Sequence, residues 1–322
     1  MMGKNDTPLE LSAVGATGAA GANAVGNMPP ISKYDNVSPR HNMSVRIASL
    51  VMRGVVYLGA IVATAVLLLI VGYILINGVP YITPSLFEWE YTSENVSLMP
   101  ALIDTVLMAA CSLIIAVPIG VGSAVYLVEY APRGSRFVRI VRITTETLQG
   151  IPSIIYGLFG MLFFVTALHW GLSLLSGACT LAIMILPTIM RTTEEALLAV
   201  PDSYREGGFG LGAGRLRTVM RCVMPSAAPG ITSGIILALG RCVGEVAALL
   251  FTAGTIAQIP NFVGQGAFAF LDSCRTLAVH MYVLASEGLH MNETYATAVV
   301  LLVVVTVLNL AANVAIKKLR KD

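Results

Sequence analysis

Long runs of apolar residues, separated by short polar segments, follow one another from about residue 50 to the C-terminal end of the chain. A helix needs roughly 20 apolar residues to cross a bilayer. Runs of about this length lie at 54–76, 104–128, 150–168, 172–190, 230–255 and 294–316. We therefore predict an all-α membrane protein with six transmembrane helices, of which the fourth and fifth are the least sharply bounded.

The basic residues predict the orientation of these helices. Lys and Arg gather before the first run, between the second and third, between the fourth and fifth, and after the sixth, whereas the other connecting segments hold only Arg275. By the positive-inside rule, both the N-terminus and the C-terminus are then cytoplasmic. His169 and Trp170 mark a tight outer hairpin at the membrane interface.

Composition supports this class. The chain is 56% hydrophobic and 12% charged, with a mean hydropathy of +0.78, which excludes a water-soluble globule with a polar surface. Residues 1–45 are instead rich in Gly, Ala, Asn and Ser, and we expect them to form a disordered cytoplasmic tail. The tail is not a signal peptide, because the first apolar run begins too far into the chain. Residues 46–322 form the predicted six-span domain.

The sequence offers no catalytic or metal-binding pattern. Its five cysteines contain no CxxC pair, so we expect no disulfide and no metal site. It contains no phosphate-binding G-x-x-x-x-G-K-[ST] loop, and neither G-x-S-x-G nor H-E-x-x-H. We therefore expect no enzyme and no cofactor. Any ATP would be hydrolysed by a partner chain.

A polar loop between the fourth and fifth runs has a recognisable spacing: Glu206, then Gly212 six positions later, then Pro225 thirteen positions after that. Ser203 and Glu206 have the spacing of a capping box, which predicts the start of a short helix after Pro201. The glycines at positions 210, 212 and 214 permit the positive φ values that turn the chain. A second, basic helix then runs as far as Pro225.

This spacing resembles the EAA loop of ABC importer permeases, in which a short helix docks into a groove on the ATPase subunit. Gly207 and Gly208 stand where alanines are usual, and Tyr204, Phe209 and Leu211 would supply the apolar contacts. The resemblance implies a coupling loop over residues 191–229. It assigns coupling roles to four residues, namely Ser203, Glu206, Gly212 and Pro225. The alternative is an ordinary loop at the membrane interface.

Two charges interrupt the fifth apolar run. Arg241 and Glu245 are four residues apart, which would place both on one helical face. A charge at the centre of a membrane helix costs about 2.5–3.5 kcal/mol, so the pair should point into the bundle or a water-filled path. Either the two form a structural salt bridge, or Arg241 donates to a passing oxyanion that Glu245 helps to orient.

Two further features belong to the same region of the chain. Arg191, at the end of the fourth run, could pass an anion on, or it could be a snorkelling anchor at the interface. Glycines repeat every four residues in two pairs, which predicts close approach of another helix. The pairs are Gly230 with Gly234, and Gly240 with Gly244.

The resemblance becomes more specific at residues 147–160, Thr-Leu-Gln-Gly-Ile-Pro-Ser-Ile-Ile-Tyr-Gly-Leu-Phe-Gly. This segment resembles permeases of the phosphate ABC importer, and its Gly and Pro would let the third span bend. Residues 279–288 are similar to the PstA-type subunit rather than to its PstC-type partner. Arg191, Arg241 and Glu245 match residues that the family associates with anion passage.

The resemblance implies a type I ABC importer permease fold in a multi-pass protein of the bacterial plasma (inner) membrane. Its implied partners are a PstC-like permease subunit, a PstB-like ATPase dimer, a PstS-like phosphate-binding protein and membrane lipid, with no nucleic acid. A permease for sulfate or molybdate is an alternative, because the EAA loop does not separate tetrahedral oxyanions. A phosphate-signalling scaffold that conducts nothing is another. Uptake by a variant of Arg241 would separate these alternatives.

Overall fold

The computed structural model describes residues 43–132 and 134–319, and all regular structure in this part of the chain is helical. The predicted tail falls almost entirely outside these residues. The principal α-helices are α2 (Met43–Gly78), α3 (Met99–Val125), α4 (Arg136–Gln149), α5 (Ser153–Gly160), α6 (Leu174–Leu198), α7 (Asp202–Gly210), α8 (Arg215–Thr218), α9 (Met224–Val243), α10 (Ala247–Thr252), α11 (Phe262–Gln265), α12 (Leu277–Glu287) and α13 (Met291–Leu319). Wider π turns continue α3 over Tyr126–Tyr130, α5 over Met161–Ala167 and α8 over Val219–Val223, and 3₁₀ turns lie at Val79–Tyr81, Pro84–Phe87 and Gly266–Leu271.

The chain divides into two units, one ending at Leu68 and the other beginning at Leu69. In the first unit, the described residues belong to α2. Apolar side chains such as Leu50, Tyr57 and Ile61 cover this helix and are exposed. A helix that is apolar on all sides and of this length is typical of a membrane span.

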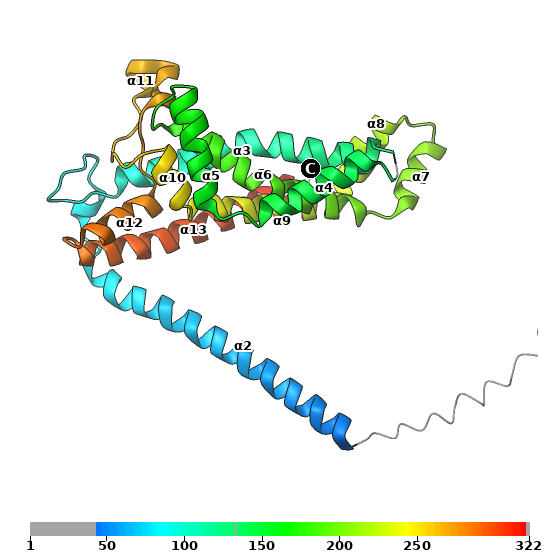
Figure 1. Cartoon of the computed structure of the whole chain (residues 1–322), viewed down its shortest axis with the longest axis horizontal. Coiled ribbons are helices and arrows are strands. Elements are labelled where there is room, and N and C mark those ends of the chain that lie inside the picture. The colour runs from blue at the N-terminus through cyan, green and yellow to red at the C-terminus, as the bar shows by residue number, and fades with distance from the viewer. Residues whose placement is uncertain (1–42, 133, 320–322) are drawn as a thin grey trace, which may run out of the picture. The chain divides into compact units, whose positions relative to one another are not determined.

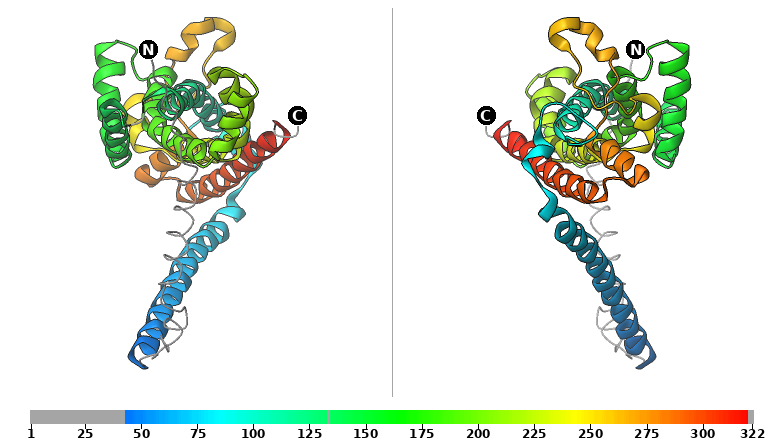
Figure 2. Two further views of the ribbon diagram at one scale, coloured as in Figure 1. Left: turned by 90° about the vertical axis from the view of Figure 1, so that its right-hand side faces the viewer. Right: turned by 90° about the vertical axis from the view of Figure 1, so that its left-hand side faces the viewer.

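The second unit is a bundle built around α6. Helices α3, α6, α9 and α13 run side by side, and α6 packs against both α3 and α9 (Figure 1). Figure 2 shows the same bundle from its two ends. Leu181, Ile185 and Ile189 of α6 are fully buried, as expected for the central helix of a bundle. The core of the unit therefore lies around α6.

The spans in the described part of the chain agree with the prediction. Among the described residues, five helices are long and apolar enough to cross a membrane, and the number reaches six if α4 and α5 count together as one span. These two helices are bent by 102° across the break that contains Gly150 and Pro152. The predicted bend of the third span is thus present. The arginines assigned to a loop before it lie partly on α4, because the helix starts at Arg136.

The fifth span differs from its prediction. The apolar run continues to residue 255, but α9 ends at Val243, and α10 begins at Ala247 after a short break. Gly244 follows the last helical residue, where glycine commonly ends helices. The expectation of one continuous fifth helix is therefore wrong. The break falls where Arg241, Gly244 and Glu245 interrupt the apolar run, a signal that the sequence analysis used only to place two charges on one helical face.

Two of the four spaced glycines do bring helices together. A Cβ on Gly230 would lie 2.5 Å from the Cβ of Ala196, and a Cβ on Gly234 would overlap Thr192, so α9 touches α6 at both positions. A Cβ on Gly240 would meet nothing within 4 Å. The first pair confirms the predicted close approach, whereas Gly240 does not contribute to it.

Polar contacts close the end of the bundle opposite α7. The backbone N–H of Arg275 donates to Asp104 Oδ2 at 2.9 Å, and the N–H of Leu277 donates to Thr105 Oγ1 at 2.8 Å. The Arg275 side chain is buried and lies over the ring of Tyr91 at 4.7 Å. These contacts hold the segment before α12 against the start of α3, a role that sequence reasoning did not assign to Arg275.

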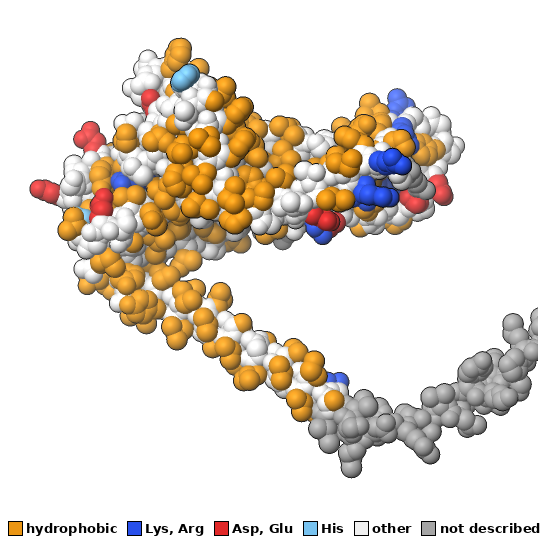
Figure 3. All heavy atoms as spheres, viewed as in Figure 1, with side chains coloured by type: hydrophobic (Ala, Val, Ile, Leu, Met, Phe, Trp, Pro, Cys, Tyr) orange, Lys and Arg blue, Asp and Glu red, His pale blue; other side chains and the backbone are white. Residues whose placement is uncertain are grey.

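The charges are distributed unequally over the second unit. On the face shown in Figure 3, Lys and Arg side chains gather towards the end formed by α7 and α8, and the middle is mainly apolar. Exposed apolar side chains there include Ile114, Phe159 and Leu162. A band of this kind matches a protein that lies in a bilayer. The predicted cytoplasmic location of the N-terminus and the C-terminus stays a prediction.

Candidate functional site

The polar loop forms the helix, turn and second helix that its spacing predicted. The chain turns between α7 and α8 at Gly212, whose φ of +78° suits glycine. Tyr204, Phe209 and Leu211 are all exposed, with Leu211 at 91%. The loop therefore presents apolar side chains at the end of the bundle where the basic residues gather (Figures 1 and 3).

The predicted capping box is absent. Helix α7 starts at Asp202, one residue before Ser203, with Pro201 as the N-cap and no side-chain cap. Ser203 therefore lies inside the first helical turn, where its hydroxyl cannot cap the helix. Both Ser203 and Glu206 are exposed. Asp202 instead places a negative charge at the N-terminal end of α7, where the helix dipole favours it.

Pro225 does not end the second helix. The helical backbone continues from Arg215 through the π turn at Val219–Val223 and along α9 to Val243. Pro225 occupies the first turn of α9, directly after the wider turn, where a missing N–H is tolerated. The loop is thus joined to the fifth span by one unbroken helical path.

Arg205 is the residue of this loop that sequence reasoning missed. Its guanidinium forms an ion pair with Glu129, in which Nη2 lies 2.7 Å from Oε1, and both side chains are largely buried. The hydrogen bond to Glu129 raises the pKa of Arg205 above its usual value. The two residues are 76 positions apart, and no local pattern links them.

Arg241 and Glu245 do not share a helical face, because α9 ends between them. The Glu245 side chain accepts a hydrogen bond from the N–H of Ala248 at 3.2 Å, at the start of α10. Arg241 lies on the last turn of α9 and is half-buried. Among the described residues it has no hydrogen-bond or ion-pair partner. The salt bridge between the two charges is therefore not formed.

The segment 147–160 packs on the second part of the fifth span. Tyr156 of α5 donates its hydroxyl to the carbonyl of Leu148 at 2.8 Å. Gly157 packs directly on α10, since a Cβ there would lie 2.8 Å from the Cα of Ala248. The structure thus brings the bent third span against the broken fifth span.

Arg191 is held by carboxylates. Its Nε lies 3.0 Å from Glu195 Oε1 on α6, and its Nη1 lies 3.7 Å from Glu146 Oε1 on α4. Arg142 and Glu194 form a second ion pair beside them. These five residues line a small cavity of about 190 Å³ between α4 and α6. Helix α6 continues to Leu198, so Arg191 lies within the helix and not at its end.

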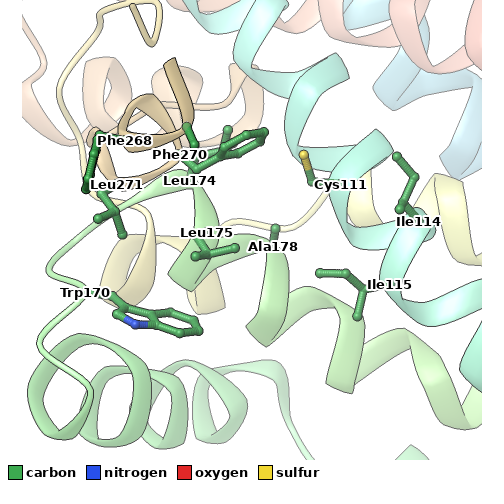
Figure 4. Close-up of a pocket in the computed structure, with 11 residues that line it drawn as sticks. Cys111, Ile114, Ile115, Trp170, Leu174, Leu175, Ala178, Phe268, Phe270 and Leu271 are labelled. Carbon is green, nitrogen blue, oxygen red and sulfur yellow. The ribbon is translucent and has the colours of Figure 1, made fainter. Parts of the chain in front are cut away.

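A larger cavity, of about 520 Å³, lies between α3, α6 and the segment 267–271 (Figure 4). Its walls are apolar and include Cys111, Ile115, Trp170 and Phe270. A cavity without charged groups does not suit an inorganic anion, which loses its hydration on entry. The charged residues of the site therefore lie outside this pocket.

The sequence matches the family model of the binding-protein-dependent transport system inner membrane component over residues 116–321. The chain belongs to this family. Members are permease subunits of ABC transporters and are not enzymes themselves.

Several curated relatives are similar to this permease. The probable ABC transporter permease protein YqgI of Bacillus subtilis (strain 168) is 34% identical over 285 residues, which cover 84% of this chain and 96% of YqgI. The phosphate transport system permease protein PstA 1 of Mycobacterium tuberculosis (strain ATCC 25618 / H37Rv) is 32% identical, with 66% and 67% covered. PstA of Haemophilus influenzae is 35% identical, with 58% and 67% covered.

Solved structures show the same fold. A bacterial ABC transporter chain involved in import of the acidic polysaccharide alginate matches with a TM-score of 0.56 and 15% identity, covering 85% of this chain and 99% of its own. The MetNI methionine ABC transporter in its native crystal form matches with a TM-score of 0.54 and 20% identity, covering 69% and 93%. The predicted type I ABC importer permease fold is thereby confirmed.

Proposed function

We propose that this permease is the PstA-type subunit of an ATP-driven importer of inorganic phosphate in the bacterial inner membrane. It would form half of the translocation path with a PstC-like subunit. A PstB-like ATPase dimer would dock on the loop α7–α8, and a PstS-like protein would supply phosphate. Similarity to phosphate transport permeases of both the PstA and PstC types supports this assignment.

The observation that carries the proposal is the free guanidinium of Arg241. An arginine within a membrane protein is costly unless it has a partner or a function. Glu245 is engaged with the start of α10, so it does not neutralise Arg241 in this structure. The planar guanidinium offers a fork of donors that matches the oxygens of a phosphate. Arg241 is therefore available to an anion in transit.

Glu245 favours phosphate over sulfate. Phosphate carries at least one proton at neutral pH and can donate a hydrogen bond to a carboxylate, whereas sulfate carries none. A carboxylate close to the binding arginine is therefore compatible with phosphate and unfavourable for sulfate or molybdate, whose charge it repels. Four residues separate Glu245 from Arg241 across the break, which keeps it within the same region of the chain.

Arg191 would act after Arg241. Its two carboxylate neighbours compete with any anion for the guanidinium, so binding there is weaker than at Arg241. A site of lower affinity lets a transported ion leave, since conduction requires binding that is not too tight. We assign Arg191 the release of phosphate and Arg241 its binding.

The test is ATP-driven uptake of radiolabelled phosphate by proteoliposomes that contain this chain with its partner permease, ATPase and binding protein. Arg241→Gln should reduce uptake by about tenfold to about a hundredfold, since a charge-assisted contact contributes about 1.5–3 kcal/mol. Arg139→Gln, which removes an exposed arginine of α4, is the matched control and should transport normally.

Excess sulfate should leave wild-type uptake unchanged. If Arg241→Gln transports phosphate at the wild-type rate, Arg241 is a structural residue and the proposed path is wrong. If sulfate competes fully, or if phosphate uptake is absent while the labelled sulfate enters, the substrate assignment is wrong and the chain is a permease for another oxyanion.

A further inference from the structure

Arg205 is the most completely engaged charged side chain of the coupling loop. Its Nε and Nη2 bind the Glu129 carboxylate, at 3.1 Å and 2.7 Å from Oε1. Nη2 also donates to the carbonyl of Leu197 at 2.9 Å, and Nη1 donates to the carbonyl of Val200 at 2.8 Å and to Asp202 Oδ1 at 3.1 Å. All five N–H groups of the guanidinium are therefore used.

These bonds connect three elements of the bundle. Glu129 belongs to the π turn that ends α3, Leu197 and Val200 belong to the end of α6 and the residues after it, and Arg205 itself belongs to α7. One side chain thus joins the coupling helix to the two helices that pack most closely with each other in the core.

Few other side chains link α7 to the end of α3. Two cavities, of about 370 and about 580 Å³, have Arg205 in their walls together with Val128 and Asp202. Helix α7 packs instead on α8 and on the π turn that follows it. The ion pair of Arg205 with Glu129 therefore joins α7 to the end of α3 beside these cavities.

The chemistry of this link suits the transmission of movement. An apolar contact resists compression, but it separates easily when one side is pulled. A two-pronged ion pair with additional bonds to backbone carbonyls resists both, and its planar fork also fixes orientation. Breaking it would leave a largely buried charge without a partner, which is strongly unfavourable.

The geometry points to Arg205 and Glu129 as a strut that carries displacement of the coupling helix α7 into α3 and α6. Both are positioning residues, because they act through the helices and not on the transported ion. This inference rests on the coupling of the permease to an ATPase. It does not depend on which anion is transported.

The experiment uses the complete importer in proteoliposomes and measures substrate transported per ATP hydrolysed. The double variant Arg205→Met/Glu129→Met removes both charges, so neither is left buried alone. We expect the variant to assemble with the ATPase, which still hydrolyses ATP. The amount of substrate transported per ATP hydrolysed should fall about tenfold, which is within the range that coupling between sites commonly spans. The control variant Arg139→Met replaces an exposed arginine of α4. It should keep the wild-type ratio of substrate transported to ATP hydrolysed.

Arg205→Lys is the second variant and keeps the importer testable if the double variant does not assemble. Lysine retains the charge but lacks the fork, so the ratio should fall while assembly and ATP hydrolysis remain. A wild-type ratio in an assembled variant of either kind would overturn the strut, since a merely structural pair would not alter the ratio of transport to hydrolysis.

A failure of the substrate assignment can be distinguished from a failure of the strut. If the wild-type importer moves no phosphate, stimulation of ATP hydrolysis by the binding protein in the same liposomes still reports communication across the membrane. The strut predicts that this stimulation is lost in Arg205→Met/Glu129→Met and retained in Arg139→Met. Equal stimulation in all three proteins would contradict it.

Discussion

Three arginines of this permease differ in how far the protein satisfies them. Arg205 uses all its donors within the chain, Arg191 is shared between two carboxylates, and Arg241 has no partner among the described residues. A guanidinium whose donors are all used within the chain has none left for an anion, whereas an unpaired or partly paired guanidinium does. At the scale of the residue, the hydrogen bonds therefore agree with the proposed roles of Arg205 in structure and of Arg191 and Arg241 towards an anion.

His280 makes a prediction at the same scale. It is fully buried in α12, and burial, together with the charge of Arg275, lowers its pKa from 6.5 to about 3. The unfolded chain takes up a proton below about pH 6.5, but the folded protein keeps His280 neutral. The free energy of unfolding should therefore fall as the pH falls from about 6.5 towards 3, by up to about 2 kcal/mol at pH 5.

The measurement is thermal unfolding of the purified permease in detergent, at about pH 7.5 and about pH 5. His280→Phe keeps a ring beside Tyr91, whose ring centroid lies 5.9 Å from that of His280, and it cannot be protonated. The variant should lose less stability on acidification than the wild type. An identical loss in both proteins would show that other groups dominate the acid response.

At the scale of the element, the coupling loop depends on glycine at one of two adjacent positions. A Cβ on Gly208 would lie 2.6 Å from Cγ2 and 2.8 Å from Oγ1 of Thr218 on α8, whereas a Cβ on Gly207 would meet nothing within 4 Å. The two helices of the loop therefore pack through Gly208.

The two glycines form a matched pair of substitutions. Gly208→Ala should destabilise the loop by about 1–3 kcal/mol, because the β-branched Thr218 has little freedom to move aside. Gly207→Ala should stabilise α7 by up to about 1 kcal/mol, through helix propensity alone. Proteolysis of the loop in the purified permease would measure both effects, as faster and slower cleavage.

Gly208→Ala/Thr218→Ala should restore much of the loss, since the second change removes the atoms that clash. Equal effects of alanine at positions 207 and 208 would mean that helix propensity, and not packing on Thr218, decides the stability of the loop.

The element scale also shows where spacing is a weak guide. Pro225 was expected to end a helix, yet it lies in a continuous helical path from Arg215 to Val243. Pro225 directly follows a π turn, where the absence of its N–H is tolerated, and sequence alone does not reveal such a turn. Likewise, Ser203 and Glu206 have the spacing of a capping box, but α7 starts one residue earlier at Asp202.

At the scale of the whole molecule, the second compact unit is organised by close contact of α6 with α3 and with α9. Gly234 touches Thr192 so closely that no side chain fits between them. Packing through small residues is a principal source of helix association in membranes, where apolar burial contributes little. Stability of the bundle therefore depends on a few such contacts.

Gly234→Val tests this dependence. The larger side chain should force α9 away from α6 and lower the stability of the bundle by about 1–3 kcal/mol. Gly240→Val is the matched control, since a Cβ at Gly240 meets nothing within 4 Å. Thermal unfolding in detergent should show a lower transition temperature for the first variant only. A similar decrease for both would assign the effect to valine within a helix and not to packing.

The sequence by itself determined the features that depend on local composition and spacing. Runs of apolar residues predicted the spans, because a helix must be long enough to cross the bilayer and must expose apolar side chains there. The spacing of Glu206, Gly212 and Pro225 predicted a helix, a turn and a second helix, and α7 and α8 have this order. The coupling role of these residues stays a prediction.

Only the tertiary structure decided which charges are satisfied. The partner of Arg205 is 76 residues away, and the break after Val243 parts Arg241 from Glu245, although their spacing of four residues suits one continuous helix. Whether a buried charge is paired depends on which distant segments pack against it, and pairing decides its energy. The chain's pattern therefore located the charged residues, and the packing of the helices decided which of them have partners within the described part of the chain.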